Sequence, residues 1–260
     1  MRFRFIAPIA ALLTIACTET NTITGRDQFL MIPASQDAAL GLEAMKEVKQ
    51  SVKLVKGKPA ERVARIGKRI AAMSDRPDMP WEFVVIDEDV LNAWALPGGK
   101  IAVYKKMLDM MESDDQLAAV LGHEISHAVL RHGAESLSRA QAQNMAIAGL
   151  GMAVGAYTKS GETAQLAATL AGVAAQGFVA LPHSRAMELE ADDIGTRYMA
   201  RAGYDPRAAV TLWQKMQKMK EGSGGQPQWL STHPTDQQRI DRLSAKMGDY
   251  LAEYQRAKKS

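Results

Sequence analysis

Residues 123–127 read His-Glu-Ile-Ser-His and place two histidines four positions apart. Four residues advance an α-helix by about 400° and 6 Å, so both imidazoles leave one face, one turn apart, and can bind the same ion. Glu124 lies about 100° round the helix from His123, where it can reach a water on that ion without ligating the ion itself. The stretch therefore predicts a metal site on a helix, with Glu124 as the general base.

The residues around this motif predict a buried helix from about residue 113 to His132. Ser113 and Gln116 form a capping box at its start. An apolar stripe follows on the motif helix, made of Leu117, Val120, Leu121, Ile125 and Val129. Two histidines and a glutamate are costly to bury unless a metal or hydrogen bonds satisfy them, which favours the metal site over chance.

A third ligand is expected from residues 183–195, HSRAMELEADDIG. Glu188 and Asp192 are four apart and share a helical face, so Glu188 can ligate while Asp192 accepts the free N–H of a ligating histidine. Glu190 points the opposite way and is interpreted as a solvated surface residue. Spacing alone leaves the identity of the third ligand open.

The remaining sequence predicts a mostly helical α+β domain with a small sheet beside the motif helix. Residues 81–87 are expected to form one strand, and residues 92–104 two more, separated by Pro97-Gly98-Gly99. The apolar residues 141–181 are expected to form packed helices rather than membrane spans. Further helices are predicted at 35–56, 59–73, 184–202, 206–220 and 235–258. We expect one domain over residues 35–260.

The N-terminus is typical of an export signal. Residues 1–16 combine two arginines with an apolar stretch too short to span a bilayer, and Cys17 follows Ala16 directly. This order resembles a bacterial lipoprotein signal, which predicts a lipid anchor at Cys17 and a polar tether over residues 17–34. The alternative is a plain secretory signal with an incidental cysteine. The position after Cys17 is Thr18 rather than the Asp that marks inner-membrane retention, which favours the outer membrane.

Composition excludes other classes of protein. Lys and Arg number 32 against 29 Asp and Glu, a net charge of +3 that is too balanced for a nucleic-acid-binding protein. A single cysteine excludes a disulfide scaffold and a thiolate metal cluster. Any metal must therefore be held by histidine and carboxylate side chains.

HEISH followed by SRAMELEAD resembles the HtpX, BepA and LoiP group of gluzincin metallopeptidases, metallopeptidase family 48, whose pattern is H-E-x-x-H plus S-R-x-x-E-x-x-A-D. Residues 92–104, STHP with Arg239 beyond it, and TGRDQFLMIP resemble other segments of that family. The chain has no repeat region as in BepA and no clear membrane spans as in HtpX. The resemblance is thus nearest the compact periplasmic lipoprotein members such as LoiP.

The resemblance implies a zincin-like fold with one Zn²⁺ per chain, held by His123, His127 and Glu188. Glu124 would be the base, and Asp192 would support the ligands from outside.

The resemblance also implies roles for His233 and Arg239, each of which has an alternative interpretation. His233 would cap the zinc in a latent state or act as a transition-state donor; the alternative is a loop histidine before Pro234. Arg239 would stabilise an oxyanion or bind substrate; the alternative is an exposed helix arginine. His132 and His183 are interpreted as surface or structural residues.

An edge strand that binds substrate is expected at Asn92, Ala93, Trp94 and Ala95. An extended substrate would pair with this strand through its backbone. This predicts modest sequence specificity and a zinc metalloendopeptidase that cleaves unfolded or misassembled envelope proteins, anchored in the periplasm as a quality-control enzyme. One alternative is a largely latent fold acting as a periplasmic chaperone or assembly factor. Another is an integral-membrane prenyl-protein protease, which the weak hydrophobicity of residues 145–181 disfavours.

Overall fold

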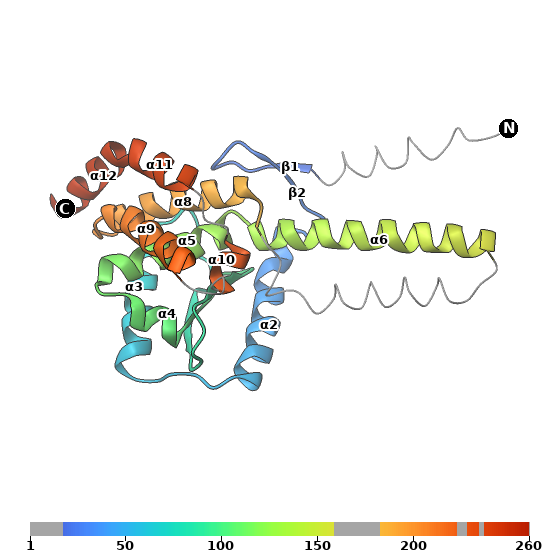
Figure 1. The fold of residues 1–260 in the computed structure, drawn as a ribbon, viewed down its shortest axis with the longest axis horizontal. Coiled ribbons are helices and arrows are strands. Elements are labelled where there is room, and N and C mark those ends of the chain that lie inside the picture. The colour runs from blue at the N-terminus through green and yellow to red at the C-terminus, as the bar shows by residue number, and fades with distance from the viewer. Residues whose placement is uncertain (1–17, 159–182, 223–227, 234–236, 260) are drawn as a thin grey trace. The chain divides into compact units, whose positions relative to one another are not determined.

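The computed structural model describes residues 18–158, 183–222, 228–233 and 237–259 (Figure 1). The chain divides into two compact units, one of residues 1–34 and 134–181 and the other of residues 35–133 and 182–260. The predicted signal segment, Cys17 and residues 159–181 of the apolar stretch 141–181 lie outside the described residues. The mostly helical α+β class predicted from the sequence is confirmed.

The first unit contains a small hairpin and most of a long helix. Strands β1 (Thr18–Thr20) and β2 (Asp27–Phe29) pair antiparallel, and α6 runs over His132–Thr158. Arg26 donates to the buried Glu135 of α6 with an Nη2–Oε2 distance of 2.7 Å, and the N–H of Met31 donates to Ser138. The stretch expected as a tether is therefore folded, because its polar side chains find partners on α6.

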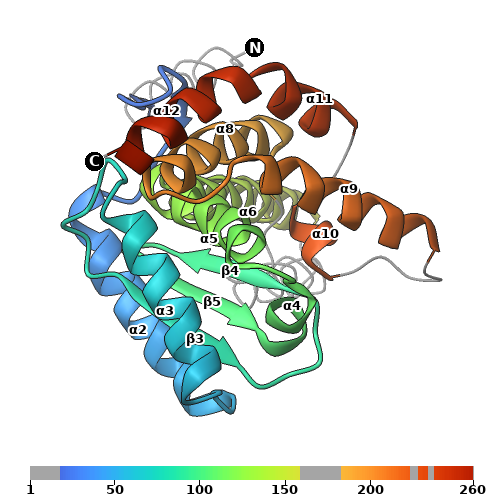
Figure 2. The same cartoon turned by 90° about the vertical axis from the view of Figure 1, so that its left-hand side faces the viewer.

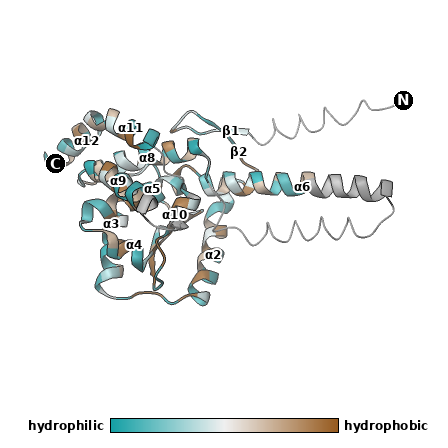
Figure 3. Cartoon of the chain, viewed as in Figure 1, coloured by the Kyte–Doolittle hydropathy of each residue, from teal (hydrophilic) through white to brown (hydrophobic). Residues whose placement is uncertain are grey.

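The second unit contains a three-stranded sheet of order β3-β5-β4 (Figure 2). Strands β3 (Glu82–Ile86) and β5 (Lys100–Tyr104) are parallel, and β4 (Ala93–Leu96) is antiparallel to β5. Gly98 and Gly99 make the β4–β5 turn with φ of 69° and 76°, the left-handed region that glycine tolerates. The three predicted strands are confirmed, and β4 lies at an edge of the sheet. The apolar residues of the strands, brown in Figure 3, are mostly buried.

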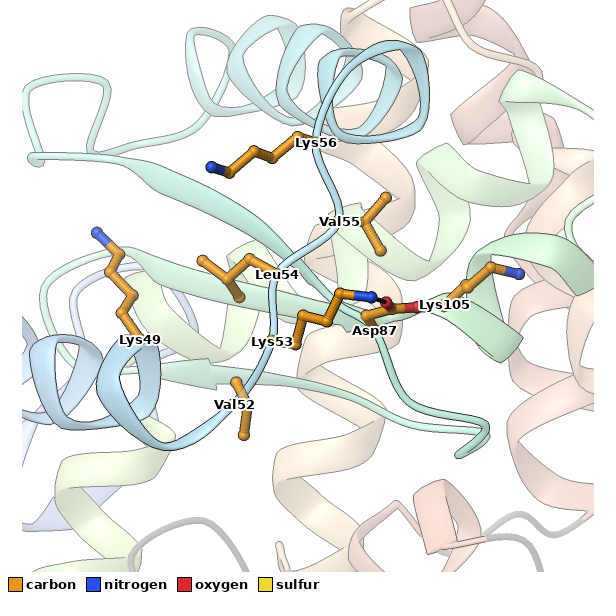
Figure 4. Close-up of a pocket in the computed structure, with 8 residues that line it drawn as sticks. All are labelled: Lys49, Val52, Lys53, Leu54, Val55, Lys56, Asp87 and Lys105. Atoms are coloured by element: carbon orange, nitrogen blue, oxygen red, sulfur yellow. Dashed lines mark ion pairs between the residues drawn. The ribbon is translucent and has the colours of Figure 1, made fainter.

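Helix α2 covers Asp37–Ser51 after a short 3-10 turn at Ala34–Gln36, so the predicted helix to residue 56 is too long. Residues 52–56 instead extend along the open edge of β3, where Leu54 bridges Ile86 and the N–H of Val55 donates to Val85. The β-branched Val52 and Val55 suit this extended course. A hollow beside this segment is lined by Lys49, Val52, Lys53, Leu54, Val55, Lys56, Asp87 and Lys105 (Figure 4). None of these is a predicted site residue.

Helix α3 (Lys58–Ala71) packs on β3 and on α5 (Asp114–Val129), and α5 in turn packs on β4 and β5. The hydroxyl of Ser113 accepts the N–H of Gln116, which confirms the predicted cap of the motif helix. The helix ends at Val129 rather than at His132, because Arg131 takes a left-handed conformation with φ of 59°. Helix α4 (Lys105–Met110) connects β5 to this region.

Helix α8 (Arg185–Arg201) crosses α5 at very short range, with Ser184 as its N-cap. A Cβ added to Gly122 of α5 would lie 2.7 Å from the carbonyl oxygen of Gly195 of α8, and a Cβ on Gly195 would meet Gly122 at 2.6 Å. Only glycine at both positions permits this approach. The crossing brings the acidic residues of α8 beside the histidines of α5.

Helices α9 (Arg207–Gly222), α10 (Gln228–Thr232), α11 (Gln237–Ala245) and α12 (Met247–Lys259) complete the described residues. The single helix predicted for residues 235–258 is wrong, because a turn at Lys246 separates α11 from α12. This turn lets α12 pack on α8, where the hydroxyl of the buried Tyr250 donates to Asp193 at 2.8 Å. Among the described residues, no helix meets the length and hydropathy needed for a membrane span.

Candidate metal centre

Three elements bring the four candidate ligands together. Helix α5 supplies His123 and His127, α8 supplies Glu188, and His233 directly follows α10. All four side chains are buried, and one ligand atom of each lies within 4.8 Å of all the others. The three predicted ligands and His233 thus converge, although His123 and His233 are 110 positions apart in sequence.

The donor atoms of the two α5 histidines converge at close range. Nε2 of His123 lies 3.0 Å from Nε2 of His127 and 3.2 Å from Nδ1 of His233. The Glu188 carboxylate lies 3.1 Å from Nδ1 of His233, 3.3 Å from Nε2 of His123 and 3.4 Å from Nε2 of His127. Ring nitrogens at this range either share a hydrogen or face a common cation.

The protonation states of these groups suit a metal ion. Burial, with the neighbouring imidazoles, holds the pKa of His127 well below its usual range, so its ring is neutral. Burial alone would raise the pKa of Glu188, but the charges of His233 and Arg239 lower it well below the usual range. Three imidazoles and one carboxylate form a donor set that suits Zn²⁺, so these residues fit the implied ion.

Asp192 lies beside His123, outside the donor cluster. Its Oδ1 lies 3.0 Å from Nδ1 of His123, out of line for a full hydrogen bond, and also accepts Trp213 Nε1–H at 3.1 Å. Burial would lower the pKa of His123, but Asp192 and Glu188 together raise it to about 9. Without a metal, His123 therefore holds a proton where the ion would bind.

Arg239 is buried against the two carboxylates of α8, so the alternative of an exposed helix arginine is wrong. Its Nη1 donates to Glu188 at 2.7 Å, while Nε and Nη2 donate to Asp192 at 2.6 and 2.7 Å. The guanidinium also lies 3.5 Å over the ring of Trp213. This geometry favours a role in holding both carboxylates over contact with an oxyanion or substrate.

Glu124 is buried next to the cluster, and its partner is a residue that the sequence did not suggest. The indole N–H of Trp229 on α10 donates to Glu124 Oε1 at 3.3 Å, and His233 Nε2 lies 3.6 Å from the same oxygen. Trp229 stacks on Trp213 with ring centroids 4.8 Å apart. A tryptophan just before the STHP segment was the signal that could have found this contact.

All five histidines of the chain gather in this region. The ring of His183 stacks on the ring of His127, with 4.1 Å between the centroids. Burial, with the charge of His233, lowers the pKa of His183 to about 3. His132 is fully buried and contacts both His127 and Glu190. The interpretation of Glu190 as a solvated residue is wrong, because its side chain is only 15% exposed and pairs with His132.

The predicted edge strand lies beside these residues. Ala93, Trp94 and Ala95 belong to β4, and Asn92 directly precedes it. The N–H of Trp229 donates to the carbonyl of Leu91 at 3.1 Å, so α10 is attached just before β4. A small sheet next to a helix that carries paired histidines matches the zincin-like arrangement predicted from the sequence.

Comparison with known proteins gives consistent matches. The model of peptidase family M48 matches residues 57–247. The mitochondrial metalloendopeptidase OMA1 of Schizosaccharomyces pombe is 38% identical over 181 residues, covering 70% of this chain and 51% of the relative. OMA1 of Danio rerio is 31% identical over 245 residues, covering 90% and 51%. The β-barrel assembly-enhancing protease of Escherichia coli K12 is 32% identical over 178 residues, covering 67% and 36%. The chain spans about half the length of these relatives, or less.

Proposed function

The chain belongs to peptidase family M48, and from this premise we propose that it is a zinc-dependent endopeptidase that cleaves unfolded or misassembled proteins in quality control. The observation that carries the proposal is the convergence of four buried donor atoms within 4.8 Å, with Glu124 beside them. His123, His127 and Glu188 would hold the ion. Two metalloendopeptidases and a protease among the relatives support the same activity.

The reaction divides between the ion and the protein. A bound zinc ion supplies Lewis acidity, which polarises a peptide carbonyl and makes a water acidic near neutral pH. Glu124 accepts the proton of the attacking water and passes it to the leaving amine. Arg239 keeps the carboxylates of Glu188 and Asp192 in place, so that the ligands are oriented before substrate binds.

Replacement of Glu124 tests this assignment. The variant Glu124→Gln should keep zinc, measured by metal analysis, and lose cleavage of unfolded casein by at least about 100-fold, since general-base catalysis contributes this much. Glu112→Gln is the matched control, because Glu112 is exposed just before the same helix and pairs with Lys215. A Glu124→Gln enzyme that cut casein at the native rate would refute the role of Glu124.

The substrate would bind in extended form along β4, which lies at the edge of the sheet. Backbone pairing gives affinity without reading most side chains, so cleavage should depend weakly on sequence and strongly on unfolding. A peptide series varied one position at a time tests this. Rates that changed by more than about 100-fold with one side chain would point to a specificity pocket instead.

A second candidate function, a latent peptidase that acts as a chaperone or assembly factor, is favoured by the position of His233. Catalytic zinc sites keep an open position, whereas His233 here supplies a fourth donor atom. Replacing His233 with Ala should raise casein cleavage several-fold if the histidine imposes latency, with zinc retained by the other three ligands. Loss of cleavage together with retained zinc would identify His233 as part of the catalytic machinery.

We propose that the enzyme lies in the bacterial cell envelope. Acylation of Cys17 would anchor it to a membrane, the outer membrane rather than the inner one. Support comes from the lipoprotein-like residues 1–17, and from an E. coli relative named for enhancing β-barrel assembly. Cys17→Ala should release the chain from the membrane fraction. Membrane association that survives this substitution would exclude the lipid anchor.

A further inference from the structure

The outer ring nitrogen of His127 faces a second histidine. Nδ1 of His127 lies 2.9 Å from Nδ1 of His132, and Nε2 of His132 lies 3.0 Å from Oε2 of Glu190. His132 is the first residue of α6 and is fully buried, while Glu190 belongs to α8. A chain of contacts therefore runs from a carboxylate on α8 through His132 to His127 on α5.

Only one arrangement of hydrogens satisfies this chain with neutral imidazoles. An ionised carboxylate can only accept, so Nε2 of His132 donates to Glu190. Nδ1 of His132 then carries a lone pair and accepts the Nδ1–H of His127. The remaining nitrogen of His127, Nε2, keeps its lone pair and faces the donor cluster.

The opposite arrangement is incompatible with ligation. A hydrogen on Nε2 of His127 would point at Nε2 of His123, 3.0 Å away, in the place where an ion would bind. With His132 neutral, the Glu190 carboxylate excludes this arrangement, because it fixes which nitrogen of His132 carries the hydrogen. The state of a ligand on α5 is thus set by a carboxylate that does not touch it.

We propose that His132 and Glu190 are positioning residues that hold His127 in the tautomer presenting Nε2 to zinc. The proposal rests on the zinc site proposed above and extends it to His132, which lies beyond the H-E-x-x-H motif, and to Glu190, which occupies a variable position of the S-R-x-x-E-x-x-A-D motif. His123 receives its support directly from Asp192, with 3.0 Å between the atoms, whereas His127 receives its support through one intervening imidazole. Outer partners of ligating histidines typically change metal affinity by about 10–100-fold.

The tautomers can be observed directly in the full-length chain without metal. Long-range ¹H–¹⁵N correlation of the histidine rings distinguishes a hydrogen on Nδ1 from one on Nε2, and variants lacking one histidine assign the signals. We expect His127 to carry its hydrogen on Nδ1 and His132 on Nε2. A hydrogen on Nε2 of His127 would overturn the proposal.

A double-mutant cycle tests the energetic link through zinc affinity, measured by competition with a chelator. His132→Phe and Glu190→Ala should each weaken zinc binding by about 10–100-fold, and the double variant should bind no more weakly than His132→Phe alone. His132→Asn, which keeps an acceptor oxygen for the His127 N–H, should recover part of the loss. Unchanged affinity in the single variants, or losses that multiply, would overturn the link.

Asp193→Ala provides the matched control. Asp193 is also a partly buried carboxylate on α8, but it bonds to Tyr250 and Lys246, away from His127. This variant should keep native zinc affinity. A loss of zinc affinity equal to that of Glu190→Ala would mean that Glu190 acts only through the general stability of the fold. If His132→Phe fails to fold, the proposal is still tested by the zinc affinities of His132→Asn and Glu190→Ala and by the tautomers of the unaltered chain.

The same measurements separate this proposal from the proposed function. A native chain that takes up no zinc would overturn both. A native chain that binds zinc, with variants of unchanged affinity, would overturn the positioning role alone and leave the peptidase assignment in place.

Discussion

The four candidate ligands come from two regions that are built in different ways. His123, His127 and Glu188 lie where α5 and α8 cross, and the crossing is fixed by glycines that meet backbone to backbone. His233 follows α10, a helix of five residues. Trp229 fixes α10 at three points: its N–H on Leu91, its indole N–H on Glu124 and its ring on Trp213.

The difference indicates that the two regions have separate roles. The ligands at the crossing cannot move apart unless two buried helices repack, so this region determines whether a metal site exists. The α10 segment is short and is held by the buried Trp229 and Leu230. We infer that its departure determines whether the site is open. Variants in the first region should therefore affect stability and metal binding, and variants in the second should affect activity.

The largest expected effect comes from removing the charge that holds the crossing together. Arg239→Leu leaves the Glu188 and Asp192 carboxylates buried without their cation, which should lower the free energy of unfolding by about 3–5 kcal/mol. Denaturant unfolding measures this loss. Arg242→Leu on the same helix is the control, because Arg242 is exposed and should change stability by less than about 0.5 kcal/mol. Equal effects at both positions would mean that Arg239 does not support the crossing.

A smaller effect is expected from separating the two helices. Gly195→Ala places a methyl group 2.6 Å from the backbone of Gly122, and overpacking of this kind costs about 1–3 kcal/mol. Zinc affinity should fall with it, because Glu188 moves away from the histidines. Gly248→Ala, where the added Cβ meets nothing within 4 Å, should be neutral or slightly stabilising. A Gly195→Ala protein with native stability and zinc affinity would show that the crossing is not the rigid region.

The sequence predicts the crossing region well because its signals are local. The spacing of His123 and His127, the Ser113 cap and the apolar stripe all act within one helix, and the structure confirms the helix and its cap. The Glu188 and Asp192 pair is also defined by helical spacing. What spacing cannot give is the distance between α5 and α8, which depends on two glycines 73 positions apart in sequence.

The contacts that the sequence did not predict all join elements far apart in the chain. Glu190 was judged from its angle on α8 alone, but His132, 58 positions earlier, contacts it there. Trp229 falls between the helices predicted for residues 206–220 and 235–258, and its role depends on Glu124, 105 positions earlier. Periodicity describes one element at a time, so it does not report which second element covers a face.

The proton on His123 gives a prediction about pH that belongs to the crossing region. Because the His123 pKa is raised to about 9, zinc must displace a proton at neutral pH, while the His127 and Glu188 pKa values are lowered and those groups are already deprotonated. Zinc affinity should therefore rise about tenfold per pH unit from pH 7 to 9 and level off above 9.

Chelator competition at each pH measures this slope. Asp192→Asn removes one of the two carboxylates that raise the His123 pKa, so the levelling should move to lower pH. A flat profile above pH 6.5 in the native chain would show that His123 binds no such proton.

The smallest expected effect separates the α10 segment from the crossing. Trp229→Phe removes the indole N–H that bonds to Glu124 and keeps a ring to stack on Trp213. Losing one such hydrogen bond, about 0.5–1.5 kcal/mol, should favour departure of α10 and raise casein cleavage by about 2–10-fold.

Stability and zinc affinity should stay native in this variant, since the crossing is untouched. Trp81→Phe is the control, because it removes an indole N–H that bonds instead to the carbonyl of Arg76. If cleavage falls in Trp229→Phe while zinc is retained, the tryptophan orients Glu124 for proton transfer. The α10 segment would then be part of the catalytic site rather than its cover, and the division between the two regions would fail at that residue.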